Sequence, residues 1–529
     1  MTRKPPEVHA RAALVVFVVI VVVAFPLYLF RLGTYHWFFR DDWGFLTGRS
    51  LGSVKDLFTP WDTHWSTVPI VVFRVLYKAV GLRSYKPYQA VVVGLHLTAV
   101  VLLRVVMRRA GVGPWLATAA AGALIFFGPG SEDILWAFQI GFTGSLVFGL
   151  TQLVLCDHEG GLEWRDGLGV VAGVLALMSS GVGVVMALVV GLAMLLRRGW
   201  KIAAVLSAPL AAAYGLYWLA ERPQTTNPFG FPKLSVILRW VRSAEIGAFR
   251  ALGHYPVVSW LLLAVLVGGL ALALWRHPRT RLRGELALPL SLLMGGLVFA
   301  VLTAIGRWPA GENGARAGRF VYLSAALLVP ALAVAAQAIA RRWRLATPAL
   351  VVLFLIAVPA NSVTFGDPPF GQKYFATQER VLTTITRMPE AAHAPGDLRP
   401  ISDPFLPAGL DMSFLRNAVR TGRLRQSSGP ISPAERLEYQ MRLGLDQKAV
   451  APSLEGCKRV AGPVDLSPAK GSSFRFLVPM TITALGPTAR SVPVVYDPSV
   501  GQRIEVVLSG LHLRLHALDP VRGLGLCDL

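Results

Sequence analysis

Charged residues are scarce in this sequence, and acidic residues are the scarcest of them. Only 16% of the 529 residues are charged, with 30 Asp and Glu against 52 Lys and Arg, whereas a soluble domain carries about a quarter. Hydrophobic residues make up 54% of the chain, and apolar runs such as 12–30 and 256–275 hold no charged residue. The scarcity of charge therefore excludes a series of soluble domains and predicts a polytopic membrane protein.

Basic residues gather beside the apolar runs instead of forming a domain of their own. Clusters of this kind are Arg3, Lys4 and Arg11; Arg108 and Arg109; Arg197, Arg198 and Lys201; Arg276, Arg279, Arg281 and Arg283; and Arg341, Arg342 and Arg344. Such clusters mark the cytoplasmic ends of membrane spans. The net charge of +22 is thus explained by topology, and no nucleic-acid partner is expected.

About eleven transmembrane helices are expected, starting from a cytoplasmic N-terminus in the plasma (inner) membrane. Their approximate ranges are 12–32, 84–106, 113–127, 138–156, 167–179, 182–196, 201–219, 256–275, 286–305, 319–340 and 345–360. Three of them, 113–127, 167–179 and 182–196, are shorter than the roughly 20 residues that cross a bilayer. We therefore expect an all-α membrane domain over 1–360, and an odd number of spans would leave the rest of the chain outside the cytoplasm.

Residues 361–529 contain no run that could cross a membrane, and they predict an exported α+β domain that ends in a β-sheet. Helices are expected at Gln378–Met388 and Pro433–Leu443. Apolar residues then alternate from Phe474 to Ile482, and again over 504–508 and 511–515, as in half-buried strands.

Cysteine is rare as well, with three in the chain and no CxxC, His/Cys cluster or HExxH, so no structural zinc site is predicted. Cys156 is expected to be an unpaired packing residue. Cys457 and Cys527 both fall in the exported segment, where a disulfide closing a loop of about 70 residues would contribute roughly 4 kcal/mol. Two separate free thiols are the alternative.

Polar residues concentrate in the first external loop, 33–68. Asp41 and Asp42 follow the first span, and Asp62 and His64 precede the next apolar stretch, among six aromatic residues: Trp37, Phe38, Phe39, Trp43, Trp61 and Trp65. The aromatic residues alone are typical of an interfacial belt. Adjacent carboxylates in such surroundings favour a general base, because burial and mutual repulsion raise the pKa of at least one of them.

This loop resembles that of the GT-C superfamily, integral-membrane glycosyltransferases that take sugars from polyprenyl-phosphate carriers. The resemblance rests on the acidic pair in Arg40-Asp41-Asp42-Trp43 and on a His/Pro element that opens an apolar helix, from Asp62 to Pro69. Protein O-mannosyltransferases, distant relatives like the arabinosyltransferases, have a similar Asp-Glu pair and a His-Pro-Pro-Leu stretch. This chain has Asp in place of Glu, and it separates His64 from Pro69.

The resemblance implies roles for several residues. Asp41 is in the position of the family's base, and Asp42 would orient it, bind the acceptor or remain solvated. Relatives place an arginine near the start of a late span against the donor phosphate, which here implies Arg319 and then Arg316. Arginine at a membrane boundary also reaches lipid headgroups without any catalytic role.

The second external loop, 128–137, contributes acidic groups to acceptor or metal in related transferases. Here it carries Glu132 and Asp133, with Gln139 close behind. These acids are equally typical of the first turn of a helix, where the helix dipole favours negative charge. No metal ligand is assigned, although a divalent cation between Asp41, Glu132 and Asp133 is a further option; His64, Glu132, Asp133 and Gln139 are expected around the acceptor.

The predicted function is therefore sugar transfer from a polyprenyl-phosphate donor to an external glycan, lipid or protein, with inversion and an aspartate base. A lipid-linked saccharide flippase or other transporter is the alternative, which would need polar residues along a path through the bilayer. Apart from His96, ionisable residues are nearly absent from the middles of the spans. The Ala-, Val-, Arg- and Gly-rich composition is typical of a high-GC bacterium, such as an actinobacterium with arabinose or mannose in its cell wall.

Overall fold

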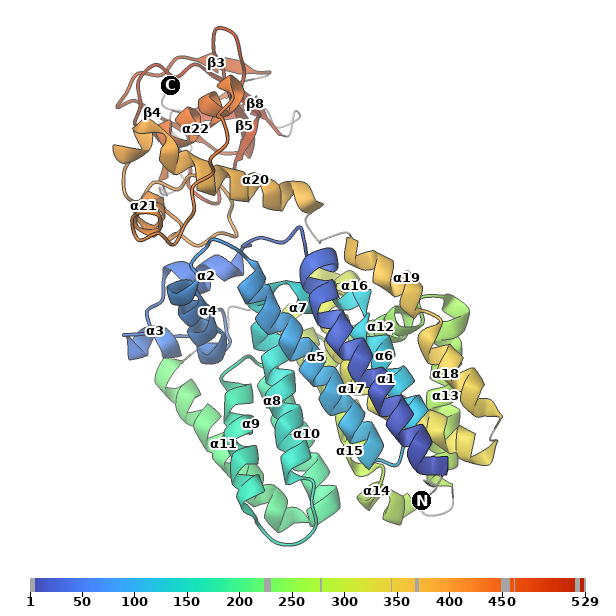
Figure 1. Ribbon diagram of the computed structural model, residues 1–529. Coiled ribbons are helices and arrows are strands. Elements are labelled where there is room, and N and C mark those ends of the chain that lie inside the picture. Colours follow the sequence, from blue (N-terminus) through green and yellow to red (C-terminus); the bar gives the residue numbers. More distant parts are fainter. Residues whose placement is uncertain are drawn as a thin grey trace. The chain divides into compact units, whose positions relative to one another are not determined.

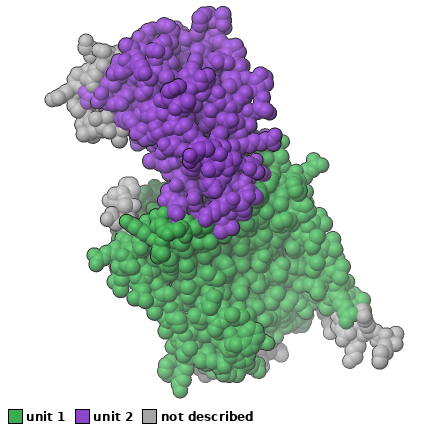
Figure 2. Space-filling view, turned by 60° about the vertical axis from the view of Figure 1, so that its left-hand side comes forward, with its two compact units in different colours: residues 1–36, 51–72, 86–369 green, residues 37–50, 73–85, 370–529 purple. Residues whose placement is uncertain are grey.

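The protein forms two compact units in the computed structural model. The structure describes residues 5–222, 230–275, 278–343, 345–366, 371–448, 457–460, 462–518 and 524–527. Unit 1 comprises residues 1–36, 51–72 and 86–369, and unit 2 comprises residues 37–50, 73–85 and 370–529. Figure 2 shows the two units in different colours. Unit 2 thus contains two pieces of the N-terminal region in addition to the C-terminal segment.

Unit 1 is a bundle of apolar helices. Eight helical stretches among the described residues are long and apolar enough to cross a membrane: Val8–Leu32, Lys86–Arg109, Ala137–Cys156, Trp200–Glu221, Pro256–Leu274, Ala287–Gly314, Gly318–Arg342 and Ala346–Val363. The main helices of the bundle are α1 (Pro5–Leu27), α5 (Lys86–Arg109), α6 (Pro114–Ile125), α8 (Ile140–Cys156), α9 (Trp164–Leu177), α10 (Val182–Arg198), α11 (Trp200–Glu221), α12 (Leu234–Gly253), α13 (Pro256–Leu274), α15 (Ala287–Arg307), α17 (Gly318–Arg342) and α18 (Ala346–Leu355). The expectation of several apolar helices that are able to cross a membrane is confirmed by their length and composition.

Three of the eleven expected spans form helices that are short for a bilayer. They are α6 with 12 residues, α9 with 14 and α10 with 17, and they correspond to the three runs that the sequence already marks as short. A helix rises about 1.5 Å per residue, so α6 alone covers less than the hydrocarbon thickness. The number of spans therefore stays a prediction.

Helix α17 lies at the centre of the bundle. Every residue from Phe320 to Ala336 is buried, because α5, α6, α12, α13 and α15 all pack against this helix. A helix that is apolar on every side has no stable place except inside a protein or a membrane. The backbone that carries Arg319, one residue before this buried stretch, is therefore anchored in the bundle.

The two ends of the bundle carry different short elements. Figure 1 shows α7 (Ser131–Leu135) and α16 (Gly311–Gly314) at one end, and α14 (Pro278–Arg283) with the start of α1 at the other. The first end also holds Arg319, the second residue of α17. The second end collects the basic clusters at the ends of α5 and α10.

Gly269 allows α13 and α17 to approach closely. A Cβ atom at this position would lie 2.3 Å from the carbonyl oxygen of Ala335, a backbone atom that cannot rotate away. Gly269→Ala should therefore separate the two helices and destabilise the protein by about 1–3 kcal/mol, measured by thermal unfolding in detergent. Gly268→Ala is the matched control, because a Cβ there meets nothing within 4 Å. Equal losses in the two variants would contradict the close approach.

Unit 2 combines helices with two antiparallel sheets. Its helices are α2 (Asp41–Thr47), α20 (Gly371–Thr384), α21 (Met412–Arg420) and α22 (Pro433–Gly444). The strands are β1 (Leu445–Lys448), β2 (Cys457–Val460), β3 (Val464–Leu466), β4 (Ser473–Phe476), β5 (Met480–Ala484), β6 (Val494–Tyr496), β7 (Arg503–Val506), β8 (Leu513–Ala517) and β9 (Leu524–Cys527). The sheet orders are β1-β7-β4-β9-β2 and β3-β8-β5-β6. The small C-terminal sheet region predicted from the alternation is confirmed.

The run from Phe474 to Ile482 is not a single strand. It divides into β4 and β5, which belong to different sheets. Pro479 lies between them and has no N–H to give to a ladder. Phe474, Phe476, Met480 and Ile482 are nevertheless all buried in one core, so the alternation predicts the burial correctly and the continuity incorrectly.

Candidate functional site

The acidic pair of the first loop opens helix α2 in unit 2. Asp42 is completely buried, and its Oδ2 atom accepts hydrogen bonds from the backbone N–H of Phe39 at 2.9 Å and from the hydroxyl of Tyr85 at 3.2 Å. The backbone N–H of Asp42 in turn donates to the carbonyl of Phe39 at 2.9 Å. Asp42 therefore fixes the turn that leads into α2 and is closed to solvent.

Asp41 is the half-buried member of the pair. The residue before it, Arg40, has φ 38° and ψ −105°, a conformation that L-residues other than glycine rarely adopt. Such strain costs of order 1–3 kcal/mol and is frequent at functional sites. The backbone immediately before Asp41 is thus held in an unfavourable conformation.

Residues of the C-terminal segment surround Arg40 within unit 2. Its guanidinium carbon lies 4.1 Å from the ring centre of Phe405 and 5.1 Å from that of Phe39. Tyr374 donates its hydroxyl to Asp403 Oδ2 at 2.5 Å and packs edge-on to Phe39. Sequence reasoning did not find Tyr374, Asp403 and Phe405, because they lie more than three hundred residues from Arg40 and form no motif with it.

In unit 1 the second loop meets the start of α17. Arg319 donates from Nη1 to Glu132 Oε1 at 3.0 Å, with the arginine side chain 38% exposed and the glutamate 18% exposed. A Cβ at Gly318 would lie 2.9 Å from the carbonyl oxygen of Pro129, so the two segments are in close contact. The structure thus brings together Glu132, Asp133 and Arg319, which the sequence placed in separate loops.

Asp133 is buried beside this ion pair, with no exposed surface. Within the described part of the chain, neither of its carboxylate oxygens has a hydrogen-bond partner, and the same holds for Oε1 of buried Gln139. Burial and the neighbouring Glu132 carboxylate raise the pKa of Asp133 well above its usual range, and Arg319 only partly opposes them. Asp133 is thus a buried carboxyl group with a raised pKa, close to a cation and a second carboxylate.

The raised pKa of Asp133 has a consequence for stability. Between the ordinary aspartate pKa and the raised one, the folded state keeps a proton that the unfolded chain loses, so stability falls as the pH rises. Asp133→Asn cannot lose this proton and should remove up to about 1.4 kcal/mol per pH unit of that decline. Thermal unfolding of both proteins between pH 5 and 8 measures it. Asp62→Asn, at an exposed ion pair, is the control, and parallel slopes for all three proteins would refute the assignment.

His64 lies in a tight turn of unit 1. The backbone groups of Trp61 and His64 exchange two hydrogen bonds of 3.0 Å, and Asp62 at the turn has φ 54° and pairs with Arg307 at 2.9 Å. A Cβ at Gly181 would lie 3.1 Å from His64 Nδ1, so the ring faces the α9–α10 turn. Burial lowers the pKa of His64, with Asp62 opposing and Arg307 assisting. His64 is half-buried in this turn, and its place around the acceptor stays a prediction.

Arg316, the second candidate for the donor phosphate, is exposed beside α12. A Cβ at Gly247 of that helix would approach the Arg316 side chain to 3.3 Å.

Sequence reasoning overlooked Lys86 and Gln89 at the start of α5. Lys86 donates to the carbonyl of Gly33 at 2.9 Å, and Gln89 donates to that of Leu135 at 3.1 Å. The sequence signal that could have identified them is a lysine at the first position of an apolar helix, because Lys86 begins α5.

The transporter alternative would need polar residues along a path through the bilayer, and His96 is the residue that the sequence analysis named in the middle of a span. His96, the exceptional ionisable residue, has both ring nitrogens engaged, Nδ1 with the hydroxyl of Tyr322 at 2.9 Å and Nε2 with the carbonyl of Ile125 at 3.2 Å. This is the packing arrangement expected for a single buried histidine.

The described residues contain no group of three or more His, Cys, Asp and Glu side chains that could hold a metal ion. No family model, curated protein or solved structure matches this chain.

Proposed function

We propose that the protein is a membrane glycosyltransferase that moves a sugar from a polyprenyl-phosphate carrier to an acceptor hydroxyl outside the cytoplasm. The observation that supports it most is the difference between the two adjacent aspartates. Asp42 is buried and accepts two hydrogen bonds, whereas Asp41 is half-buried and follows the strained residue Arg40. A rigid carboxylate next to an accessible one is suited to general-base chemistry.

The reaction needs a base and a cation. The acceptor hydroxyl loses its proton to Asp41 as its oxygen attacks C1 of the donor sugar. The C1–oxygen bond to the carrier breaks, and the polyprenyl phosphate leaves with both electrons and an added negative charge. The phosphate needs no proton, but its charge must be stabilised. The new glycosidic bond has the inverted configuration, because attack and departure occur on opposite faces.

Arg319 is the cation that we assign to the donor phosphate. Its position at the first turn of the buried helix α17 is fixed, and its ion pair with Glu132 uses only one of five N–H donors. Arginine binds phosphate oxygens in a bidentate manner, so the remaining donors suit a phosphodiester. Glu132 orients the guanidinium, and the raised pKa of Asp133 disfavours a second negative charge beside the phosphate.

We assign the acceptor side to the exterior and the basic helix ends to the cytoplasm of a plasma membrane. Cys457 and Cys527 provide a test of this orientation. Their side chains lie outside the described residues, but their backbones are directly opposite in the β2–β9 register, a spacing that suits a disulfide. Mass spectrometry without reductant should find the two peptides linked if unit 2 is in an oxidising compartment. Alkylation of both thiols in the untreated protein would contradict the bond and remove this support for export.

The proposed activity is tested by supplying the purified protein in lipid nanodiscs with synthetic polyprenyl-phosphate sugars. Release of polyprenyl phosphate and appearance of sugar on an external acceptor, without any nucleotide sugar, would support it. Movement of an intact lipid-linked saccharide across vesicles without bond cleavage would refute transfer and indicate a flippase.

A further inference from the structure

A second polar site lies at the other end of unit 1, away from α7 and Arg319. A cavity of about 640 Å³ opens between the loop after α8, the end of α10 and helix α14. The side chains that matter for its chemistry are His158, Glu159, Arg197, Arg198, Thr280 and Arg283. The proposed transferase site uses none of them.

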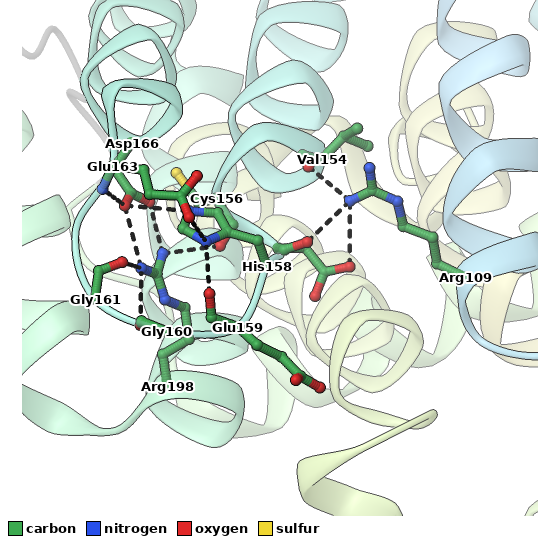
Figure 3. Close-up of polar contacts among 11 residues, drawn as sticks. Arg109, Val154, Cys156, His158, Glu159, Gly160, Gly161, Glu163, Asp166 and Arg198 are labelled. Atoms are coloured by element: carbon green, nitrogen blue, oxygen red, sulfur yellow. Dashed lines mark hydrogen bonds and ion pairs between the residues drawn. The ribbon is translucent and has the colours of Figure 1, made fainter.

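One wall of the cavity is held in place by hydrogen bonds from both Nη groups of Arg198. Arg198 donates to both oxygens of Asp166, at 2.6 and 3.1 Å, and to the carbonyl oxygens of Gly161 at 2.6 Å and Cys156 at 3.0 Å. Figure 3 shows these groups converging on the guanidinium. Asp166 also accepts the backbone N–H of Glu163 at 2.9 Å, which closes the capping box of α9. The loop is thereby fixed around the arginine.

Arg197 is oriented in a similar way, but only through one nitrogen. Its Nε atom donates to Asp157 Oδ1 at 3.0 Å, and Asp157 also binds Arg109 at 3.3 Å. Asp157 and Asp166 are each only 4% exposed, so both carboxylates lie behind the arginines. In the described part of the chain the two Nη groups of Arg197 have no hydrogen bond, and they remain as donors toward the cavity.

Helix α14 supplies donors from the opposite side. Its sequence is Pro-Arg-Thr-Arg-Leu-Arg. Thr280 and Arg283 are exposed and line the cavity, and among the described residues neither side chain takes part in a hydrogen bond or ion pair. An arginine has five N–H donors and no acceptor. The cavity therefore has an excess of donors and of positive charge over the single carboxylate of Glu159 that shares its lining.

Exposed tryptophans indicate how deep in a bilayer this cavity would lie. Trp164 opens α9, Trp200 opens α11 and Trp275 follows α13, and their exposed fractions are 71%, 68% and 81%. All three are adjacent in sequence to segments that line the cavity. Tryptophan side chains at helix ends are typical of the membrane–water interface. The arginines are thus at the level of lipid headgroups.

We propose that this cavity binds the phosphate group of an anionic lipid headgroup from the leaflet at this end of the bundle. Arg283 and the Nη groups of Arg197 would contact the phosphate oxygens, and Thr280 would donate one further hydrogen bond. Lipid is the source that the tryptophans favour, since a soluble phosphate ester would not need a site at headgroup depth. Basic pockets between membrane helices take up such lipids by the same charge-assisted contacts.

The test uses the whole protein and two variants of one helix. Native mass spectrometry counts phosphatidylglycerol retained by protein taken from nanodiscs, with phosphatidylcholine as the neutral lipid and inorganic phosphate as the soluble anion. Arg283→Gln should lower phosphatidylglycerol affinity about fivefold to tenfold, the loss of a charge-assisted contact. Arg281→Gln removes the same charge from α14 at a residue outside the cavity lining, and it should change affinity less than twofold.

Three outcomes would overturn the proposal. An equal loss of phosphatidylglycerol affinity in the two variants would show that general surface charge explains the binding. Equal retention of phosphatidylcholine and phosphatidylglycerol would show that the negative charge of the lipid is not recognised. Saturation by inorganic phosphate with no competition from lipid would assign the cavity to a soluble phosphate ester. Because Arg283 has no structural partner among the described residues, Arg283→Gln should unfold at the same temperature as the native protein, which separates lost binding from lost folding.

Discussion

Replacing Asp41 with asparagine should lower sugar transfer by roughly 10²–10⁴-fold, the usual contribution of a general base, while the protein remains folded. Asparagine keeps the size and hydrogen-bonding shape of aspartate but cannot accept the acceptor proton. Binding of the donor should be unchanged, because its phosphate is assigned to Arg319 in unit 1. Single-turnover transfer and donor affinity, measured side by side, give the two quantities.

Asp42→Asn is the informative comparison, since Asp42 differs from Asp41 in burial and not in chemistry. Its carboxylate accepts two hydrogen bonds in a site closed to solvent, so the variant should lose about 1–3 kcal/mol of stability. Its transfer rate, corrected for folded protein, should fall less than that of Asp41→Asn. Full activity in Asp41→Asn with a known donor and acceptor would remove the base assignment, and a larger loss in Asp42→Asn would transfer it to Asp42.

The apolar helices could be predicted because each is a long run of apolar residues that is read directly from the sequence. Runs such as 256–275 contain no charge, and α13 occupies almost the same range. Helix α12 was missed for the opposite reason. It carries Arg239, Arg242 and Arg250 among its apolar residues, so it lacks the uninterrupted apolar run from which the other helices were predicted.

The candidate site was predictable only in its individual residues. Local motifs located Asp41, Asp42, Glu132 and Asp133, but nothing in the sequence distinguishes the buried aspartate of the first pair from the half-buried one. The contact between Glu132 and Arg319 joins residues 187 positions apart, and the helix-dipole interpretation of Glu132 required no partner. Long-range pairing depends on how α7 and α17 pack, which periodicity does not encode.

Arg319→Ala should weaken donor binding and also slow the chemical step, together by about 10²–10³-fold in kcat/KM. The phosphate gains negative charge as the sugar leaves, so a cation that holds it contributes more in the transition state than in the bound donor. Arg307→Ala is the matched control, because Arg307 ends α15, the helix before the connection to α17. Its ion pair with Asp62 has nearly the same length, 2.9 Å, but both side chains are about half exposed, and we expect less than a threefold change.

A third variant distinguishes phosphate binding from a purely structural ion pair. Glu132→Gln removes the charge that pairs with Arg319 and keeps a hydrogen-bond acceptor at 3.0 Å from Nη1. If Arg319 binds the donor, this variant should retain most of the donor affinity and lose rate only through looser orientation of the guanidinium. If Arg319 serves only to neutralise Glu132, the two substitutions should cost the same, and the double variant should cost no more than either. That second pattern, with donor affinity unchanged in Arg319→Ala, would remove Arg319 from the site and leave the phosphate to Arg316.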